Sequence, residues 1–143
     1  MANTLREGTL RTPAVTLSYA EGPATGRPLV LLHGGSARWQ AFESIIPGLA
    51  ADYHLCIPDL RGHGRSGWTP GHYTLRDFAG DIVAFLREVV AEPAALFGHS
   101  LGGIVARLLR RPTHRLLADV GNVLHNQDPQ AVLLAVAEYL RSV

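Results

Sequence analysis

The sequence has a single cysteine, Cys56, among its 143 residues. One thiol cannot form an internal disulfide, and Cys56 lies within the apolar run YHLCIPDL, which is typical of a buried core position. The sequence therefore indicates neither a disulfide scaffold nor a redox role for this thiol. A reducing compartment is the simpler location for such a chain, and we expect it to be cytoplasmic.

Long apolar runs and strong charge are also lacking. No stretch approaches the ~20 apolar residues of a membrane span, and the first residues, MANTLREGTLRTP, lack the apolar segment of a signal peptide. The net charge is +1, and the nearest basic cluster, Arg107, Arg110 and Arg111, is more typical of a solvated helix end than of nucleic-acid binding. We expect neither a membrane nor a nucleic acid as partner, and no metal or cofactor.

What is present is a regular alternation of strand and helix patterns. Residues 8–20 indicate one or two edge strands, and apolar runs typical of buried strands follow at 29–32, 53–60, 94–97 and 114–120. Helical spacing of apolar residues covers 38–51, 75–89, 100–111 and 129–141. This order predicts an α/β fold with a mostly parallel sheet flanked by helices, in a single domain over residues 1–143.

Two details of the helices follow from individual residues. Thr74 and Asp77 have the spacing of a capping box and predict the start of the helix over 75–89. The helix over 100–111 is expected to turn four apolar residues toward the core: Leu101, Ile104, Val105 and Leu108.

The segment FGHSLGG places Ser100 between Gly98 and Gly102 in a G-x-S-x-G frame. It follows an apolar strand and precedes an amphipathic helix, which is the context of a nucleophile elbow. Such a turn would strain the serine backbone, and the helix N-terminus behind it would stabilise an oxyanion. The competing interpretation is that Ser100 merely caps the helix. The same letters match no phosphate-binding loop, which argues against a nucleotide-binding fold.

A second glycine-rich segment, His33-Gly34-Gly35-Ser36, ends an earlier strand. Because the carboxyl ends of parallel strands lie at one edge, we expect this loop to lie beside Ser100. The backbone N–H groups of Gly35 and Leu101 are the expected oxyanion donors, each typically worth about 3 kcal/mol in the transition state. His33 is interpreted as a turn former hydrogen-bonded to backbone rather than as a catalytic group.

The loop DLRGHGRS, residues 59–66, is expected at the same edge. It contains no evident base directed at a nucleophile. We expect His63 to be structural or to face the substrate, and Arg61 and Arg65 to brace the loop.

Four ordered blocks, LVLLHGGS, CIPDLRGHGRS, YTLRDFAGDIVAFL and LFGHSLGG, resemble the α/β-hydrolase superfamily, specifically its esterase-like and C–C-hydrolase-like branch. The resemblance covers about residues 15–111 and implies a serine hydrolase with Ser100 as nucleophile and Gly35 and Leu101 as oxyanion hole, acting on a small ester. A serine is unlike the carboxylate nucleophile of the haloalkane dehalogenases and most epoxide hydrolases of this fold.

The C-terminal segment resembles the last strand, histidine loop and final helix of that family. Asn122 stands where the resemblance expects the catalytic histidine, and His125, in the same loop, is the leading candidate for the base. Asp119, near the end of the last strand, is the preferred acid, and Asp128 is interpreted as a helix N-cap. The weaker candidates for the base are the other histidines near these loops, His33, His63, His99 and His114.

Only a short stretch separates Ser100 from Asn122. The segment that carries the acid and the cap in the family is therefore expected to be missing near 111–113, which implies a shortened α/β-hydrolase core without a cap domain. Two interpretations stay open: a lidless serine hydrolase for a small ester, and a catalytically impaired remnant that acts in binding or association. Uncovered apolar surface would favour a homodimer.

Overall fold

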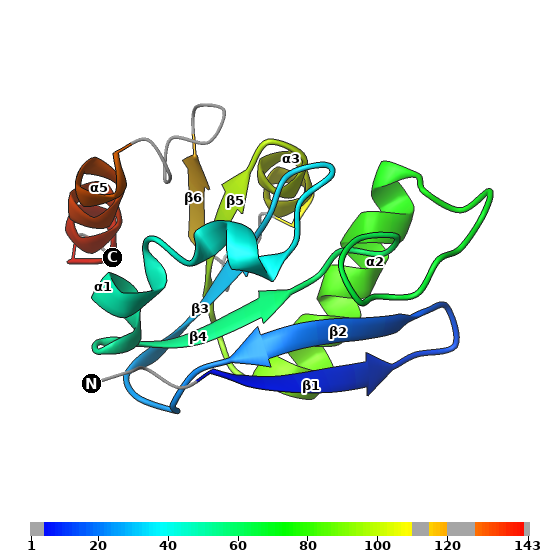
Figure 1. Cartoon of the computed structure of the whole chain (residues 1–143), viewed down its shortest axis with the longest axis horizontal. Helices are drawn as coiled ribbons and strands as arrows, with labels where there is room; N and C mark the ends of the chain where they lie inside the picture. Colours follow the sequence, from blue (N-terminus) through cyan, green and yellow to red (C-terminus); the bar gives the residue numbers. More distant parts are fainter. Residues whose placement is uncertain (1–4, 110–114, 120–127, 142–143) are drawn as a thin grey trace.

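The computed structural model describes residues 5–109, 115–119 and 128–141. In these residues a mixed sheet carries helices on both faces (Figure 1). The elements in chain order are β1 (Arg6–Arg11), β2 (Thr16–Glu21), β3 (Arg27–Leu32), η1 (Trp39–Phe42), α1 (Ile46–Ala50), β4 (Tyr53–Pro58), α2 (Leu75–Phe85), η2 (Leu86–Val90), β5 (Ala95–His99), α3 (Leu101–Leu108), β6 (Arg115–Asp119) and α5 (Pro129–Arg141). The predicted alternation of strands and helices is confirmed.

The strands lie in the order β1-β2-β4-β3-β5-β6. Neighbours from β4 to β6 pair in parallel, whereas β2 pairs with β4 in the antiparallel direction and β1 completes a hairpin at the edge. The mostly parallel sheet is thus confirmed. Of the one or two edge strands expected over residues 8–20, β1 lies at the edge, whereas β2 pairs on both sides. The loops that follow β3, β4 and β5 therefore leave the sheet at one edge.

The alternation of side chains along β3 divides the core into two layers. Leu29 and Leu31 belong to the cluster on one face of the sheet, with residues of α1 and α5. Val30 and Leu32 belong to the cluster on the other face, with residues of α2 and α3. Successive residues of a strand point to opposite faces, so a buried strand needs apolar residues at every position.

Both predicted helix starts at capping residues are present. The backbone N–H of Asp77 donates to Thr74 Oγ1 (3.1 Å), and the N–H of Thr74 donates to Asp77 Oδ2 (3.0 Å), which completes the capping box of α2. At the start of α5, the N–H of Ala131 donates to Asp128 Oδ1 (3.1 Å). None of the described helices is both long and apolar enough to cross a membrane.

The prediction of one continuous helix over residues 38–51 is wrong. The segment forms the short 3-10 helix η1, a turn, and then α1, with Pro47 in the first turn of α1. Proline has no N–H to donate to the preceding turn and disfavours helical geometry in the residue before it. Pro47 therefore begins a new helix instead of extending the first one.

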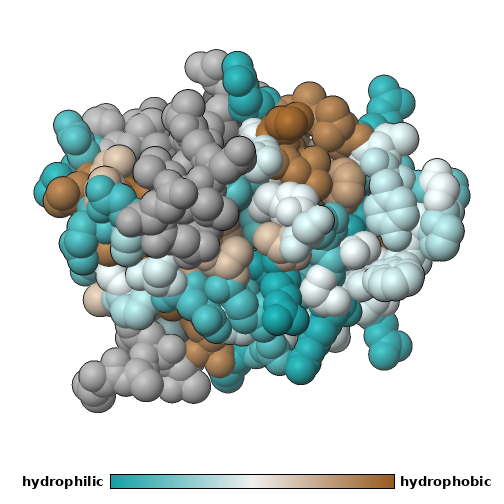
Figure 2. Space-filling model, turned by 45° about the horizontal axis from the view of Figure 1, so that its top comes forward, coloured by the Kyte–Doolittle hydropathy of each residue, from teal (hydrophilic) through white to brown (hydrophobic). Residues whose placement is uncertain are grey.

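The prediction of which residues of α3 face the core is also partly wrong. Ile104 and Leu108 are 49% and 56% exposed, and Figure 2 shows an apolar patch in this region. The buried residues of this segment are instead Gly102, Gly103, Val105, Ala106 and Leu109. Because a Cβ on Gly102 would overlap the carbonyl oxygen of Leu32, α3 packs on the sheet through its small residues. That close approach turns the two larger side chains outward.

Candidate active site

Ser100 occupies the sharp turn between β5 and α3. Its backbone has φ 52° and ψ −116°, a conformation that side-chain-bearing residues seldom adopt, and the residue is exposed. Its carbonyl accepts a hydrogen bond from the N–H of Ile104 (3.0 Å), but its side chain makes no capping hydrogen bond to α3. Ser100 is therefore a strained, exposed residue at a helix N-terminus whose hydroxyl does not cap that helix.

The two glycines that flank Ser100 are required by close backbone packing. A Cβ on Gly98 would overlap the carbonyl oxygen of Gly102. A Cβ on Gly102 would overlap the carbonyl oxygen of Leu32 and lie 2.7 Å from that of His33. The G-x-S-x-G frame thus lets the turn between β5 and α3 lie tightly against the end of β3.

The glycine-rich loop after β3 lies directly against this turn. A Cβ on Gly34 would lie 3.2 Å from Ser100 Cβ and 3.0 Å from His99 Nδ1. A Cβ on Gly35, one residue further, would have no atom within 4 Å, so the space in front of this residue is open. The predicted proximity of the two loops is confirmed, whereas the Gly35 N–H as an oxyanion donor stays a prediction.

His33 ties the loop after β3 to the loop after β4. Its side chain is fully buried, its Nδ1 lies 2.7 Å from the carbonyl oxygen of Gly34, and the N–H of Leu60 donates to its Nε2 (2.9 Å). An Nε2 that accepts leaves Nδ1 as the donor to Gly34, which describes a neutral ring. Burial lowers the pKa of His33 to about 4. The interpretation of His33 as a backbone-bonded turn former is confirmed.

Asp59 organises the same edge, a role that the sequence analysis missed. Its Oδ1 accepts from the N–H of Trp39 (2.8 Å), and its Oδ2 accepts from the N–H of Arg65 (3.0 Å). Gly64, at φ 52°, packs against this carboxylate where a Cβ would overlap it. The sequence contained one indication of this role, because Asp59 directly follows a buried strand and precedes a glycine-rich loop.

Arg61 fastens the loop after β4 to α2. Its Nε and Nη2 each donate to the carboxylate of Asp81 at 2.6 Å, and both side chains are only 4% exposed. Arg65 lies on the surface and pairs with Glu7 (Nη1 to Oε2, 3.0 Å). The backbone carbonyl of Arg61 lies 2.8 Å from His63 Nδ1. The prediction that these arginines brace the loop is confirmed, with the buried one carrying the stronger contact.

A cleft of about 660 Å³ opens between the loops after β3 and β4. Its lining consists of Ser36, Ala37, Arg38, Gln40, Ala41, Gly62, His63 and Gly64. The Oε1 atom of Gln40 is buried without a hydrogen-bond partner among the described residues. Clefts of this volume suit small organic ligands. His63 thus holds the backbone of its own loop and also lines the cleft.

The remaining candidates for base and acid are only partly described. Asp119 ends β6 in register with His99, which places its backbone at the same edge of the sheet as Ser100. His125, Asn122 and His114 lie outside the described residues. A catalytic arrangement of Ser100, His125 and Asp119 therefore stays a prediction. Within the described part of the chain, the group of side chains spaced to hold a metal lies elsewhere, on β2 and β4.

The fold and this edge of the sheet agree with a known family. The family model for the alpha/beta hydrolase fold matches residues 27–115, more than half of the chain. The chain belongs to the alpha/beta hydrolase family.

Individual relatives share parts of the same architecture. A magnesium-chelatase 30 kDa subunit of Rhodobacter capsulatus is 42% identical over 64% of this chain and 33% of the relative. A 3-hydroxybutyrate-oligomer hydrolase of Cupriavidus necator is 33% identical over 69% of this chain and 36% of the relative. The crystal structure of an epoxide hydrolase from Vigna radiata superposes with a TM-score of 0.74 at 26% identity, over 82% of this chain and 41% of that one. The chain spans about a third of the length of these curated relatives.

Proposed function

We propose that the protein is a carboxylesterase-like serine hydrolase that uses Ser100 as its nucleophile on a small ester. The observation that carries the proposal is the conformation of Ser100, which is exposed at φ 52° on the turn before α3 with no side-chain cap to the helix. A strained residue persists where the surrounding structure holds it, and such residues cluster at active sites.

The chemistry follows from the position of this hydroxyl. Ser100 Oγ attacks the ester carbonyl and a base takes its proton, after which the alcohol leaves with that proton and water releases the acid from the acyl-enzyme. The backbone N–H of Leu101, in the first turn of α3, has no partner within the helix and can donate to the developing oxyanion. The N–H of Gly35 is the proposed second donor. His125 is the proposed base, and Asp119 is the proposed carboxylate that orients it.

The substrate is proposed to be a small ester whose acyl or alcohol part occupies the cleft of about 660 Å³. Similarity to the 3-hydroxybutyrate-oligomer hydrolase of Cupriavidus necator supports hydrolytic chemistry of this kind. A serine at position 100, where most epoxide hydrolases of this fold are expected to carry a carboxylate, favours acyl transfer over epoxide opening.

The nucleophile can be tested by covalent labelling. A fluorophosphonate probe is expected to modify Ser100 in the wild-type protein, identified by mass spectrometry of the modified peptide, and turnover of an activated nitrophenyl ester is expected to depend on the same residue. Ser100→Ala should abolish both signals, whereas Ser44→Ala, at an exposed serine in the turn before α1, should retain them. Folded wild-type protein without labelling at Ser100 would contradict the proposal.

The base is tested separately. His125→Ala is expected to reduce ester turnover by about 10²-fold or more if this histidine accepts the serine proton. Asn122→His is then expected to change turnover little.

The second candidate function is a catalytically impaired member of the family that acts in association. It is favoured by Asn122 at the position where the resemblance expects the catalytic histidine, and by similarity to a relative named as a subunit, the 30 kDa subunit of magnesium chelatase. Under this alternative the wild-type protein turns over no ester, and Asn122→His creates activity.

A further inference from the structure

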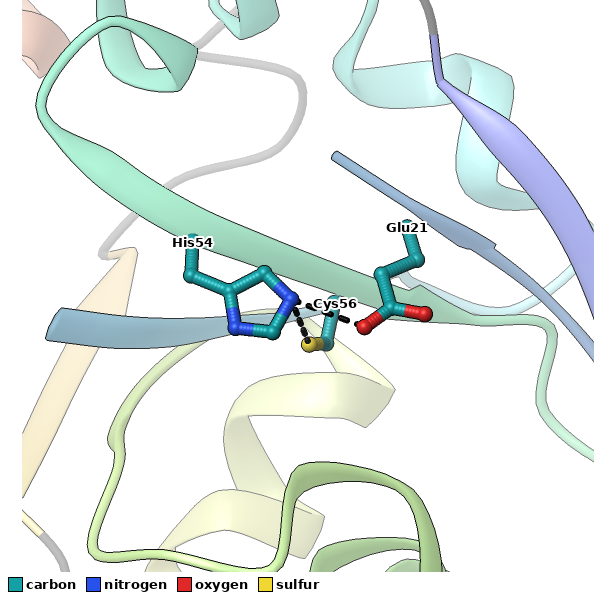
Figure 3. Close-up of side chains that lie close together, drawn as sticks. All are labelled: Glu21, His54 and Cys56. Atoms are coloured by element: carbon teal, nitrogen blue, oxygen red, sulfur yellow. Dashed lines mark hydrogen bonds and ion pairs between the residues drawn. The ribbon is translucent and has the colours of Figure 1, made fainter. Parts of the chain in front are cut away.

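Three potential metal ligands converge on β2 and β4, away from the candidate active site. His54 Nε2 lies 2.8 Å from Glu21 Oε1 and 3.8 Å from Cys56 Sγ, and the three ligand atoms all lie within 4.8 Å of one another. Figure 3 shows the thiol and the carboxylate on the same side of the imidazole, with Nε2 facing both. The cluster therefore presents one nitrogen, one sulfur and one oxygen to a common point.

The pairing of the strands produces this convergence. His54 and Cys56 are two residues apart on β4, so their side chains leave the same face of the sheet. Glu21 is the antiparallel partner of Cys56 on β2, and directly opposed residues also share a face. β4 pairs with β2 on one side and with β3 on the other, so its backbone is held rigidly. A site on such elements is preorganised better than one on loops.

We propose that Glu21, His54 and Cys56 form a binding site for a divalent transition-metal ion, with zinc as the expected ion. Zinc takes cysteine sulfur, histidine nitrogen and carboxylate oxygen at about 2.0–2.3 Å in tetrahedral geometry. Calcium and magnesium prefer all-oxygen ligand sets, so the sulfur selects against them.

Two of the three distances between ligand atoms can be compared directly with what such a centre needs. Tetrahedral bonds of these lengths separate neighbouring ligand atoms by roughly 3.4–3.6 Å. The 3.8 Å between His54 Nε2 and Cys56 Sγ is near this value, whereas the 2.8 Å between Nε2 and Glu21 Oε1 must widen by about 0.6 Å. Glu21 has a long side chain that is 30% exposed, so it can make this adjustment without moving a strand.

Burial leaves one open side to the cluster. The Cys56 side chain is fully buried, whereas the side chains of His54 and Glu21 are 13% and 30% exposed. The exposed side admits the ion and a water as fourth ligand. Burial and the nearby Glu21 carboxylate raise the pKa of Cys56 to about 12, so the metal-free thiol is protonated and metal binding displaces this proton to solvent.

The location favours a structural role for the ion. The three ligands connect β2, and with it the β1–β2 hairpin, to the parallel part of the sheet. The cluster lies before the end of β4, whereas the candidate active site lies beyond that end. The proposal is thus independent of the proposed ester hydrolysis, and an ion bound only to the folded chain would raise its stability.

Cobalt(II) provides a probe for thiolate coordination. Titration of the chelator-treated wild-type chain with Co²⁺ is expected to produce a thiolate-to-cobalt charge-transfer band in the near ultraviolet that saturates at one equivalent and is reversed by Zn²⁺. Cys56→Ser should abolish the band, and His54→Gln and Glu21→Gln should each weaken binding by at least about tenfold. His72→Gln, at an exposed histidine outside the cluster, should bind as the wild type does.

Thermal unfolding provides a second readout that does not depend on the absorbance of the cobalt complex. Zn²⁺ is expected to raise the Tm of the wild type and of His72→Gln equally, and to raise that of Glu21→Gln clearly less at the same Zn²⁺ concentration. Because Glu21 is partly exposed, this variant keeps the test valid even if Cys56→Ser fails to fold. A wild-type chain that binds Co²⁺ without the charge-transfer band, or that binds no better than the three ligand variants, would overturn the proposal.

Discussion

At the scale of single residues, Gly102 shows how a missing side chain positions the candidate nucleophile. A Cβ here would meet the backbone carbonyl oxygens of Leu32 and His33, which cannot move aside as the end of a flexible side chain can. Any larger residue must push α3 away from the end of β3. Because Ser100 lies on the turn that enters α3, the same displacement would also move its hydroxyl.

We predict that Gly102→Ala lowers the free energy of unfolding by about 1–3 kcal/mol, as overpacking typically does. Gly80→Ala is the matched control, because Gly80 lies within α2 and a Cβ added there would have no atom within 4 Å. This control should raise stability by about 0.5–1 kcal/mol through helix propensity. Urea unfolding of the two variants measures both effects, and an equal response would contradict the close approach at Gly102.

At the scale of elements, α3 shows that apolar residues alone do not identify the buried face of a helix. Its larger apolar residues are spaced to lie along one side of the helix, but that side only partly faces the sheet, so hydrophobic spacing by itself predicts the wrong rotation. The rotation is decided by small residues: Gly102 and Ala106 allow the helix axis to approach the sheet, and Val105 fills the remaining space. Ile104 and Leu108 are left on the outer side.

Adjacent leucines at the end of α3 test this rotation with the same chemical change. Leu109 is 7% exposed and packs in the core beneath α2 and α3, whereas Leu108 is 56% exposed. We predict that Leu109→Ala lowers the free energy of unfolding by about 2–3 kcal/mol, whereas Leu108→Ala changes it by less than about 0.5 kcal/mol. Denaturant unfolding of the two variants would contradict this arrangement if the order were reversed.

At the scale of the whole molecule, long-range contacts join segments that are far apart in the chain. Arg27 Nη2, at the start of β3, donates to the carbonyl oxygen of Leu140 in α5 (2.7 Å), across 113 positions of sequence. Val132 and Val136 of α5 pack in the same cluster as Leu29 of β3. The second face of the sheet is thus closed by the last described helix.

The buried His33 ring should make global stability depend on pH. The pKa of His33 is about 4 in the folded chain, against an ordinary value of 6.5, so between these values the unfolded chain binds a proton that the folded chain excludes. The contribution of His33 is therefore complete above about pH 6.5 and is lost as the pH falls toward 4. From pH 7 to pH 5 we predict a loss of about 2 kcal/mol from this group.

The measurement is urea unfolding at both pH values for the wild type and for His33→Gln. Other groups titrate alike in the two proteins, so the difference between their pH dependences isolates His33. The variant should be less stable at pH 7, because it loses the hydrogen bonds to Gly34 and Leu60, but should lose less stability between pH 7 and pH 5. Parallel pH dependences would contradict a neutral, buried His33.

Much of the fold was predictable because local features carry it. Unbroken apolar runs indicated β3, β4 and β5, and the capping box at Thr74 and Asp77 indicated where α2 begins. The strained turn at Ser100 was predictable for the same reason, since a serine between two glycines at a strand-to-helix junction is a local pattern. The break in the segment over residues 38–51 was missed, although Pro47 was a visible signal.

The candidate site was predictable only in part. The meeting of Gly34 with Ser100 followed from the rule that parallel strands end at one edge. The hydrogen bonds of Asp59 with the backbone of Trp39 and Arg65 could not be predicted. They join loops whose positions relative to one another are not determined by local sequence patterns.

The sequence by itself thus determined the order of strands and helices and the strained serine at the turn between β5 and α3, because side-chain periodicity and backbone sterics act over a few neighbouring residues. Only the tertiary structure decided the rotation of α3 and the insertion of β4 between β2 and β3. It alone placed Glu21 beside His54 and Cys56. These features depend on close packing and strand pairing between distant segments, and such contacts exist only in the folded chain.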